Sequence, residues 1–452
     1  MSDSLGLKEG VSMALGGMIG GGIYAVLGVV AGITMSAIWF AFLVAGVVAM
    51  CAGYSYNKLN SLTDNQGGSV TFVQCYLGNS TVAGIVGWTL LFGYIGSMAM
   101  YAFAFGEFTA AFGVVPTSII ANVPIRPLIS VMAVAGFVGL NLLGAQTTGT
   151  TENVLVALKV GILVVFGLLG LVYAFGFSGA PFEYGVSHLG GFGPIMAAAI
   201  SFVAFQGWQL LYYDQESIEN PVDTIRKAVY VSIPVAVAIY ILVGMVTVNL
   251  VPQALESHSH VALKDAASMM MQPYGLAHVG AVVLALSALF STGSAINATL
   301  FSSAHFAKGM LSDDLLPDQI GNSGTDGIPE RTVLVLGSLT AAFAWYGSLG
   351  AITSFASLSF ILVFGSMSYL AFRQRDHDEV NAVIPAVGTV GALAFFPLML
   401  YNLYTREPNT FYMVLGIAAV VLAVELLYFE RDLIEEEVTQ FEPDVGTVSE
   451  GD

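Results

Sequence analysis

The chain alternates between long apolar runs and short polar stretches that contain glycine, proline, asparagine or charged residues. Most runs approach or exceed the roughly 20 residues that an α-helix needs to cross a bilayer. The pattern therefore predicts an all-α integral membrane protein with about twelve transmembrane helices. The predicted spans cover approximately residues 10–33, 36–57, 81–112, 127–144, 152–175, 194–213, 224–251, 275–307, 331–346, 349–372, 381–402 and 410–429.

The composition agrees with this pattern. Of the 452 residues, 56% are hydrophobic and only 10% are charged. Soluble proteins carry roughly 25% charged residues, so this chain has too few to face water on all sides. A soluble enzyme is thereby excluded.

The basic residues predict the orientation of the spans. With the N-terminus inside, nine of the thirteen lysines and arginines fall on the cytoplasmic side: Lys8, Lys58, Arg226, Lys227, Lys308, Arg331, Arg373, Arg375 and Arg431. Arg126, Lys264 and Arg406 fall outside, and Lys159 falls within a span. Because cytoplasmic loops are enriched in basic residues, we expect a multi-pass plasma membrane protein with both termini in the cytoplasm.

Acidic residues dominate the charge: 31 against 13 basic residues give a net charge of -18. Nine carboxylates lie in residues 430–452, which predicts a solvated, disordered cytoplasmic tail. The negative excess argues against nucleic acid and anionic lipid surfaces as partners, because both repel it. Acid-rich loops also suit a halophilic source, which is a hypothesis. The two cysteines imply no disulfide framework, and the first residues lack the features of a signal peptide.

The first span contains five glycines within residues 16–22. One interpretation is close helix packing, because glycines four residues apart let helix backbones approach. The other is an interrupted helix, because glycine tolerates backbone conformations that side chains exclude.

The sixth span places two amide side chains, Gln206 and Gln209, and the glycine Gly207 at membrane depth. Unpaired polar groups in hydrocarbon are costly, so these residues should line a cavity or a protein interior. Spans 1–5 and 6–10 form two consecutive sets of five, and spans one and six are the first members of these sets. Glycine-interrupted spans at matching positions favour an inverted-repeat transporter, with its binding site between broken helices. Where a helix unwinds, its N–H groups can bind a carboxylate and its carbonyl groups an ammonium, so the site suits an α-amino acid.

These segments resemble the APC superfamily of amino acid, polyamine and organocation transporters, which share the LeuT-type fold. Residues 16–24 resemble the family's GxxIGxGIF motif, and residues 216–221 resemble its E-x-x-N-P motif after helix 6. Residues 65–69 and 77–88 are similar to the segment that leads into helix 3, and residues 291–317 are similar to helix 8 and its loop. The resemblance implies a 5+5 inverted repeat with discontinuous helices 1 and 6. The implied units are a first repeat (1–175), a second repeat (194–372), two extra helices (381–429) and the tail (430–452).

The resemblance also implies a substrate site. The backbone of Gly20, Gly21 and Gly22 would bind the substrate carboxylate. The remaining implied site residues are Met18, Ile19, Phe202 and Phe205, whose carbonyls would bind the amino group, together with Ser97, Gln206, Gly207, Trp208 and Gln209 beside the substrate. Phe205 is a candidate gate, with simple packing as the alternative.

Lys159 is the basic residue placed inside a span. Its side chain can extend to the membrane–water interface, as that of an ordinary helix-end lysine does. Alternatively it is buried, and because burying an ammonium group costs free energy, it should then have polar partners and a functional role. In similar sodium-independent transporters, a helix-5 lysine takes the place of a bound cation between helices 1 and 8. The resemblance thus implies that Lys159 contacts helix 1 and a hydroxyl of helix 8 such as Ser291 or Thr292. It also implies transport that is independent of sodium, with a proton as the candidate coupling ion.

We therefore expect a sodium-independent secondary transporter of amino acids that works by alternating access. Neutral amino acids are favoured, because the inferred pocket contains no acidic side chain. A cationic amino acid or polyamine transporter or exchanger, and a transporter-like nutrient sensor, remain alternatives. The chain is not expected to be an enzyme, and no cofactor or metal site is expected, since no suitable cluster of His, Asp or Glu lies at membrane depth.

Overall fold

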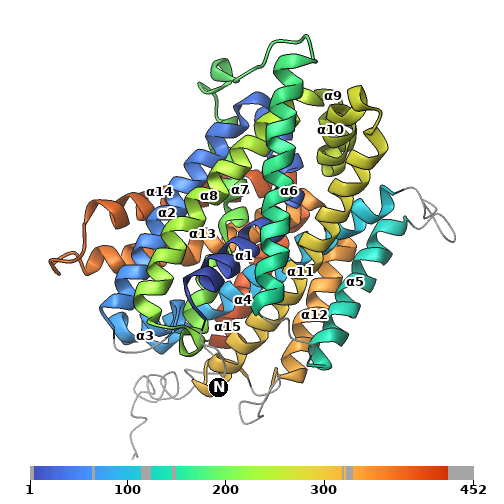
Figure 1. The fold of residues 1–452 in the computed structure, drawn as a ribbon. Coiled ribbons are helices and arrows are strands. Elements are labelled where there is room, and N and C mark those ends of the chain that lie inside the picture. The colour runs from blue at the N-terminus through green and yellow to red at the C-terminus, as the bar shows by residue number, and fades with distance from the viewer. Residues whose placement is uncertain are drawn as a thin grey trace, which may run out of the picture.

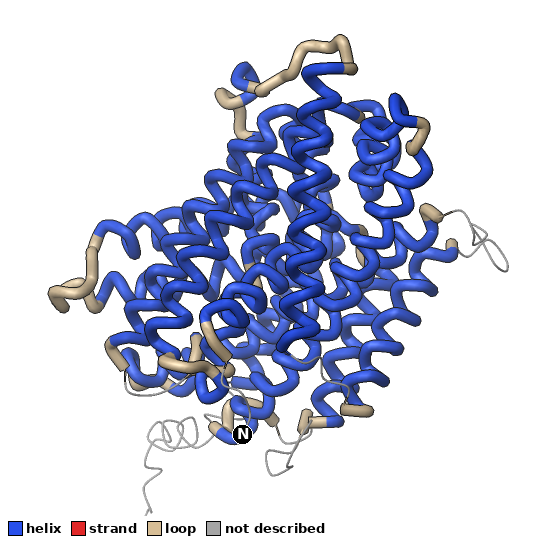
Figure 2. Tube along the Cα trace, in the orientation of Figure 1, coloured by secondary structure: helices blue, strands red, loops and turns tan. Residues whose placement is uncertain are grey.

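The described part of the chain is almost wholly helical. The computed structural model describes residues 5–63, 67–112, 124–144, 149–317, 320–321 and 329–425, so the predicted acidic tail lies outside it. The helices run alongside one another as a single bundle (Figures 1 and 2). Within the described ranges, the extended backbone pairing is one isolated parallel bridge between Leu5 and Ile218.

The helices follow the predicted order. The α-helices are α1 (Leu7–Thr34), α2 (Ile38–Ser61), α3 (Ser69–Leu77), α4 (Ser80–Ala110), α5 (Ile125–Leu142), α6 (Gly149–Gly176), α7 (Gly193–Ser201), α8 (Pro221–Leu250), α9 (Pro252–His258), α10 (Ala262–Met271), α11 (Ala277–Ser312), α12 (Glu330–Tyr346), α13 (Leu349–Arg373), α14 (Val383–Arg406) and α15 (Pro408–Val424). The 3-10 segments are η1 (Met35–Ala37), η2 (Val186–His188), η3 (Phe202–Phe205), η4 (Trp208–Tyr213), η5 (Gln215–Ser217), η6 (Ser259–Val261) and η7 (Gln272–Tyr274).

Each of the twelve predicted spans has a helical counterpart. Nine described segments are long and apolar enough to cross a membrane, and the first of them comprises both α1 and α2. The 17-residue helices α12 and α15 occupy the predicted ninth and twelfth spans. The hydrophobic pattern therefore located the helices correctly.

Local sequence signals explain several helix ends. The Asn79 side chain accepts a hydrogen bond from the backbone N–H of Val82 at 2.8 Å and so caps the start of α4. Ser348 caps α13 in the same way through the N–H of Ala351, at 3.0 Å. Proline in the first turn opens α7, α8, α9 and α15, where its missing N–H leaves no bond unmade.

Helix α1 lies at the centre of the bundle. It contacts α4, α6, α7, α8 and α11, and its residues from Met18 to Gly28 are all buried. Figure 1 shows α1 enclosed between α6, α8 and α4. A glycine-rich central helix allows this many neighbours, because each missing side chain lets another backbone come close.

One predicted detail of helix 1 is wrong in this structure. The interruption expected at the glycine segment does not occur, and α1 is a continuous α-helix of 28 residues from Leu7 to Thr34. Neighbouring helices or segments lie close to Gly17, Gly20, Gly21 and Gly22, in agreement with the packing interpretation of these glycines. The predicted interruption of helix 6 does occur: α7 ends at Ser201 and gives way to η3 and η4.

Candidate functional site

The break in helix 6 lies at Gln206 and Gly207. Gln206 has an extended backbone (φ -81°, ψ 154°), and Gly207 has φ +129°, a conformation that a residue with a side chain rarely adopts. Gly207 also packs against Gly17 of α1, since a β-carbon on Gly207 would lie 2.7 Å from the Cα of Gly17. The two glycines therefore allow the broken segment and α1 to touch through their backbones.

Helix α13 supports the start of the break. The hydroxyl of Ser357 donates a hydrogen bond to the carbonyl oxygen of Ile200 at 2.6 Å and accepts one from the N–H of Val203 at 3.1 Å. These bonds pair two backbone groups at the place where the α-helical bonding pattern ends.

The predicted carboxylate-binding glycines of α1 are covered by side chains from three other helices. A β-carbon on Gly21 would overlap the ring of Tyr101 from α4. A β-carbon on Gly20 would lie 2.9 Å from Ala295 of α11, and one on Gly22 would lie 2.7 Å from the Tyr240 hydroxyl of α8. Because α1 is continuous, the N–H groups here take part in the helix, and these glycines serve close packing.

Three neutral polar side chains form a buried cluster at the break. The Nε2 group of Gln206 donates to the hydroxyl of Tyr101, and the Nε2 group of Gln209 donates to Oε1 of Gln206 at 3.2 Å. The Oε1 atom of Gln209 accepts from the N–H of Gly207 at 2.6 Å. All three side chains are at most 1% exposed. The sequence analysis missed Tyr101, although it lies one helical turn after the predicted Ser97.

Tyr240 joins α8 to the same region and was also missed. Its hydroxyl bonds to the carbonyl oxygens of Met18 at 2.5 Å and Ala204 at 2.9 Å. The Met18 carbonyl, predicted to receive the substrate amino group, is thus occupied by a tyrosine in this conformation. The sequence signal for Tyr240 was its position within the apolar span 224–251, because a buried hydroxyl needs a hydrogen-bond partner.

The remaining predicted residues lie around the cluster but face other helices. Phe205 packs edge-on against Tyr240 of α8 at 5.3 Å, and Phe202 packs against Phe364 of α13 at 5.8 Å. Trp208 packs on Phe364 with ring centroids 5.0 Å apart. The Ser97 hydroxyl donates to its own helix at the Gly93 carbonyl, 2.9 Å away, and Ile19 is fully buried in α1.

Comparison with known proteins identifies the family of this chain. A sequence profile of the family described as amino acid permease matches residues 5–424. The chain belongs to the amino acid permease family. This permease is 29% identical over 432 residues to the inner membrane transport protein YbaT of Escherichia coli, covering 94% of this chain and 96% of that protein.

Two further relatives show the range of the family. The methylthioribose transporter of Bacillus subtilis is 22% identical over 400 residues, which cover 84% of each chain. Cationic amino acid transporter 4 of Mus musculus is 26% identical over 369 residues, covering 78% of the permease and 56% of that protein. The permease is therefore a multi-pass membrane transporter of a small molecule, and not an enzyme.

A solved structure shows the fold. A manganese transporter of Eremococcus coleocola superposes with a TM-score of 0.60 at 11% identity, covering 96% of the permease and 95% of that chain. The permease therefore has the LeuT-type transporter fold, as its sequence predicted.

The buried Lys159 of the permease lies on α6 and is 4% exposed. Its ammonium group donates to the hydroxyl of Ser294 on α11, and Ser294 in turn donates to the Ser291 carbonyl at 3.1 Å. This hydroxyl belongs to the predicted partner helix but comes from Ser294, not from the named Ser291 or Thr292, and the predicted contact of Lys159 with helix 1 stays a prediction. The Thr292 hydroxyl bonds to Ala288 within its own helix at 2.7 Å, and the Ser291 hydroxyl has no partner among the described residues.

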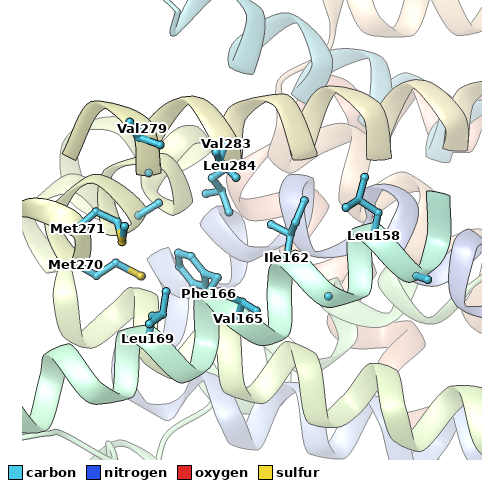
Figure 3. A pocket seen from close by; sticks show the side chains of 14 residues that line it. Leu158, Ile162, Val165, Phe166, Leu169, Met270, Met271, Val279, Val283 and Leu284 are labelled. Carbon is cyan, nitrogen blue, oxygen red and sulfur yellow. The ribbon is translucent and has the colours of Figure 1, made fainter. Parts of the chain in front are cut away.

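Two cavities lie away from the break. A cavity of about 420 Å³ between α6, α10 and α11 is lined by apolar residues such as Phe166, Met270 and Leu284 (Figure 3). A smaller one of about 210 Å³ between α6 and α11 includes Lys159 and Ser287 in its lining. The larger cavity offers a polar substrate no charged or hydrogen-bonding side chain.

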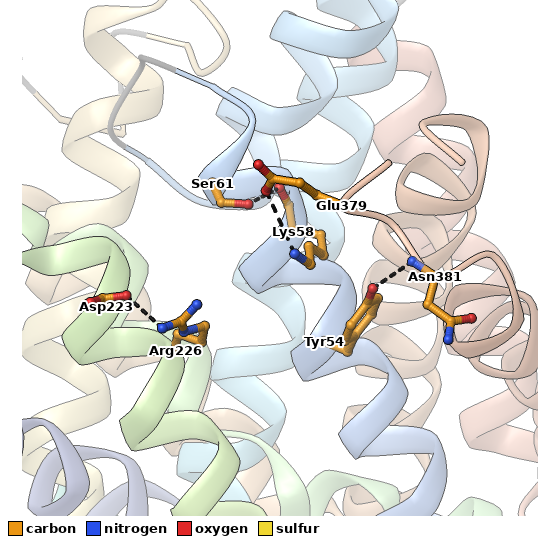
Figure 4. A network of polar contacts seen from close by, with 7 residues as sticks. All are labelled: Tyr54, Lys58, Ser61, Asp223, Arg226, Glu379 and Asn381. Atoms are coloured by element: carbon orange, nitrogen blue, oxygen red, sulfur yellow. Dashed lines mark hydrogen bonds and ion pairs between the residues drawn. The ribbon is translucent and has the colours of Figure 1, made fainter. Parts of the chain in front are cut away.

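Polar contacts join the end of α2 to the α13–α14 connection, and a separate ion pair lies within α8 (Figure 4). Lys58 lies 3.8 Å from Glu379, Arg226 lies 2.7 Å from Asp223, and the Tyr54 hydroxyl accepts from the N–H of Asn381 at 2.8 Å. These partly exposed ion pairs contribute little stability, because water screens them.

Proposed function

We propose that this permease is a secondary active transporter that moves neutral amino acids across the plasma membrane by alternating access, independently of sodium. Both termini lie in the cytoplasm in this proposal, in accordance with the distribution of basic residues. The observation that carries the proposal is the buried, uncharged cluster of Tyr101, Gln206 and Gln209 at the break in helix 6.

The cluster has the chemistry that an α-amino acid requires. The Gly207 N–H is free of the helical bonding pattern and is paired with the Gln209 side chain instead. A substrate carboxylate could take the place of the Gln209 oxygen at this N–H, because a charged acceptor forms a stronger hydrogen bond than an amide. The carbonyl groups near the break would receive the amino group.

Binding requires Tyr101 to move. Its ring covers Gly21, so the ring and a substrate cannot occupy the same place. Displacing the ring would break the Gln206–Tyr101 hydrogen bond and release the Gln206 amide for the substrate. In this proposal, the present arrangement is one in which the Tyr101 ring closes the site.

The uncharged cluster favours a neutral substrate. A cationic side chain taken out of water needs an anionic partner, and these three residues provide none. The similarity to cationic amino acid transporter 4 of Mus musculus keeps cationic amino acids as the second candidate. In that case the acidic partner would have to come from another part of the chain.

Counterflow tests both candidates directly. The full-length protein is reconstituted in liposomes preloaded with one unlabelled compound at a time, chosen from neutral amino acids, lysine, arginine and a diamine. We expect neutral amino acids to drive uptake of the same labelled compound. The Gln206→Leu variant should raise the half-saturating concentration roughly tenfold, because a buried hydrogen-bond partner is removed.

The matched control is Gln253→Leu, which changes an exposed glutamine on α9. Counterflow driven only by the cationic compounds would contradict the neutral assignment. Saturable binding without any flux would instead favour a nutrient sensor.

A further inference from the structure

The segment formed by α9, η6 and α10, residues 252–271, lies across one end of the central helices. Figure 1 shows α9 and α10 at the end of the bundle opposite the N-terminus. Its η6 turn contacts both α1 and α4, the helices that carry Gly21 and Tyr101. A β-carbon on Gly28 of α1 would overlap the Ser259 backbone, so the turn rests directly on α1.

His260 of η6 is inserted between this segment and α4. Its ring meets the Phe103 ring edge-on, with centroids 5.5 Å apart and planes at 76°. The Nδ1 atom is buried and has no hydrogen-bond partner among the described residues. Buried polar atoms are normally paired, so an imidazole held in this way is an exception that calls for an explanation.

A cation stands close to this histidine. The guanidinium carbon of Arg126, from α5, lies 3.9 Å from the centre of the same Phe103 ring. Arg126 is held there by a 2.6 Å hydrogen bond to the Ala344 carbonyl and by Glu107, whose carboxylate lies 3.9 Å from its Nε. Phe103 therefore contacts both Arg126 and His260.

The other ionisable groups near η6 do not face His260. On the segment itself, Glu256 and His258 are exposed, and Lys264 lies 3.9 Å from Asp265. On α1, the Tyr24 hydroxyl bonds to Ser287 of α11 at 2.8 Å. Glu107 and Arg126 are thus the charged groups that face His260 from the neighbouring helices.

We propose that His260 is a proton-binding site that links the closure of the segment 252–271 to pH. Neutral His260 packs against Phe103 and keeps the segment on α1 and α4. Protonated His260 carries a charge beside Arg126 in a partly buried place, so the segment moves away to hydrate it. The proposal takes its functional meaning from the transport function above, in which this movement would open one route to the site.

The sign of the pH dependence follows from burial. Burial lowers the pKa of His260, Glu107 opposes this effect, and Arg126 adds to it. In the open, solvated segment the pKa should return to about 6.5. Closure is therefore fully favoured above that pH, and it is lost as the pH falls through the lower pKa of the closed form.

Spin labels can measure the movement without any substrate. We would place them at Glu256→Cys on α9 and Tyr346→Cys at the end of α12, both exposed, in a Cys75→Ser background that leaves only the buried Cys51. We expect one short distance at pH 8 and a second, longer distance at pH 5, with a midpoint below about pH 6.5. The His260→Gln variant should keep the short distance at both pH values.

The matched control is His258→Gln, which removes an exposed histidine two residues away and should leave the pH response intact. A wild-type distance that ignores pH, or a response that survives His260→Gln, would overturn the proposal. If His260→Gln does not fold, NMR titration of labelled histidine in the His258→Gln protein decides, and a His260 pKa at or above about 6.5 contradicts the proposal. None of these results depends on transport, so they stand apart from a failure of the proposed function.

Discussion

The ring of Tyr101 on α4 lies directly over the backbone of Gly21 on α1, with no room for a β-carbon between them. The same tyrosine accepts a hydrogen bond from Gln206 at the break in helix 6. One side chain therefore joins the central helix to the broken one, at the place where the proposed function puts the substrate.

Replacing Gly21 with alanine should force Tyr101 off its position. The added methyl group overpacks a filled site, which costs about 1–3 kcal/mol, and it weakens the Gln206 contact. We expect a lower melting temperature in a thermal-shift assay. The Tyr101→Leu change should recover most of the stability lost in Gly21→Ala.

Gly32→Ala is the control on the same helix, because a β-carbon there meets nothing within 4 Å. It should be neutral or slightly stabilising, since alanine favours helix by roughly 0.5–1 kcal/mol over glycine. Equal stability of the two alanine variants would show that Tyr101 does not cover Gly21.

The Gln209→Leu variant should destabilise the break in helix 6. It leaves the buried Gly207 N–H without its 2.6 Å partner, at a cost of about 1–3 kcal/mol. We expect a lower melting temperature and reduced counterflow, whereas Gln253→Leu on the surface should change neither. Full activity of Gln209→Leu would mean that the Gly207 N–H has another acceptor in the working transporter.

Lys159→Met should separate substrate binding from ion coupling. The substitution removes the ammonium group that donates to Ser294 but retains a long apolar side chain. In proteoliposomes, wild-type uptake should ignore a sodium gradient and respond to an inward proton gradient, and the variant should lose only the proton response.

Leu158→Met is the matched control, because Leu158 precedes Lys159 and is 56% exposed, and the change keeps an apolar side chain of similar size. Its uptake should equal that of the wild type. A sodium requirement in the wild type, or an unchanged proton response in Lys159→Met, would refute this role for Lys159.

The Leu5→Pro variant should loosen the segment after the break in helix 6. The N–H of Leu5 donates to the Ser217 carbonyl at 2.8 Å, and the Glu219 N–H donates back to the Leu5 carbonyl at 2.9 Å. Proline has no N–H, so the first bond is lost. We expect faster hydrogen exchange in residues 214–220.

Leu7→Pro provides the comparison, because Leu7 is the first residue of α1, where proline is well accepted. Its exchange in residues 214–220 should match that of the wild type. Equally slow exchange in Leu5→Pro would show that the bridge does not hold this segment.

Much of the architecture could be predicted from local sequence. The twelve apolar runs predicted the helices because the length and composition of each run suffice to recognise a membrane span. The interruption at Gln206 and Gly207 was predictable for a related reason. Amide side chains within an apolar span need partners, and a glycine beside them tolerates an irregular backbone.

The sequence by itself thus determined the number and order of the spans, the family resemblance and the position of one helix break. Only the tertiary structure decided what the glycines of α1 do. Residues 16–22 are compatible with a broken or a continuous helix. In the structure the helix is continuous, and the Tyr101 ring, the Tyr240 hydroxyl and Ala295 pack against its glycines. The α11 hydroxyl that Lys159 contacts was decided in the same way, because Ser291, Thr292 and Ser294 lie within one turn of α11. The rotation of α11 against α6 selects Ser294, and such a rotation depends on packing between helices far apart in the sequence.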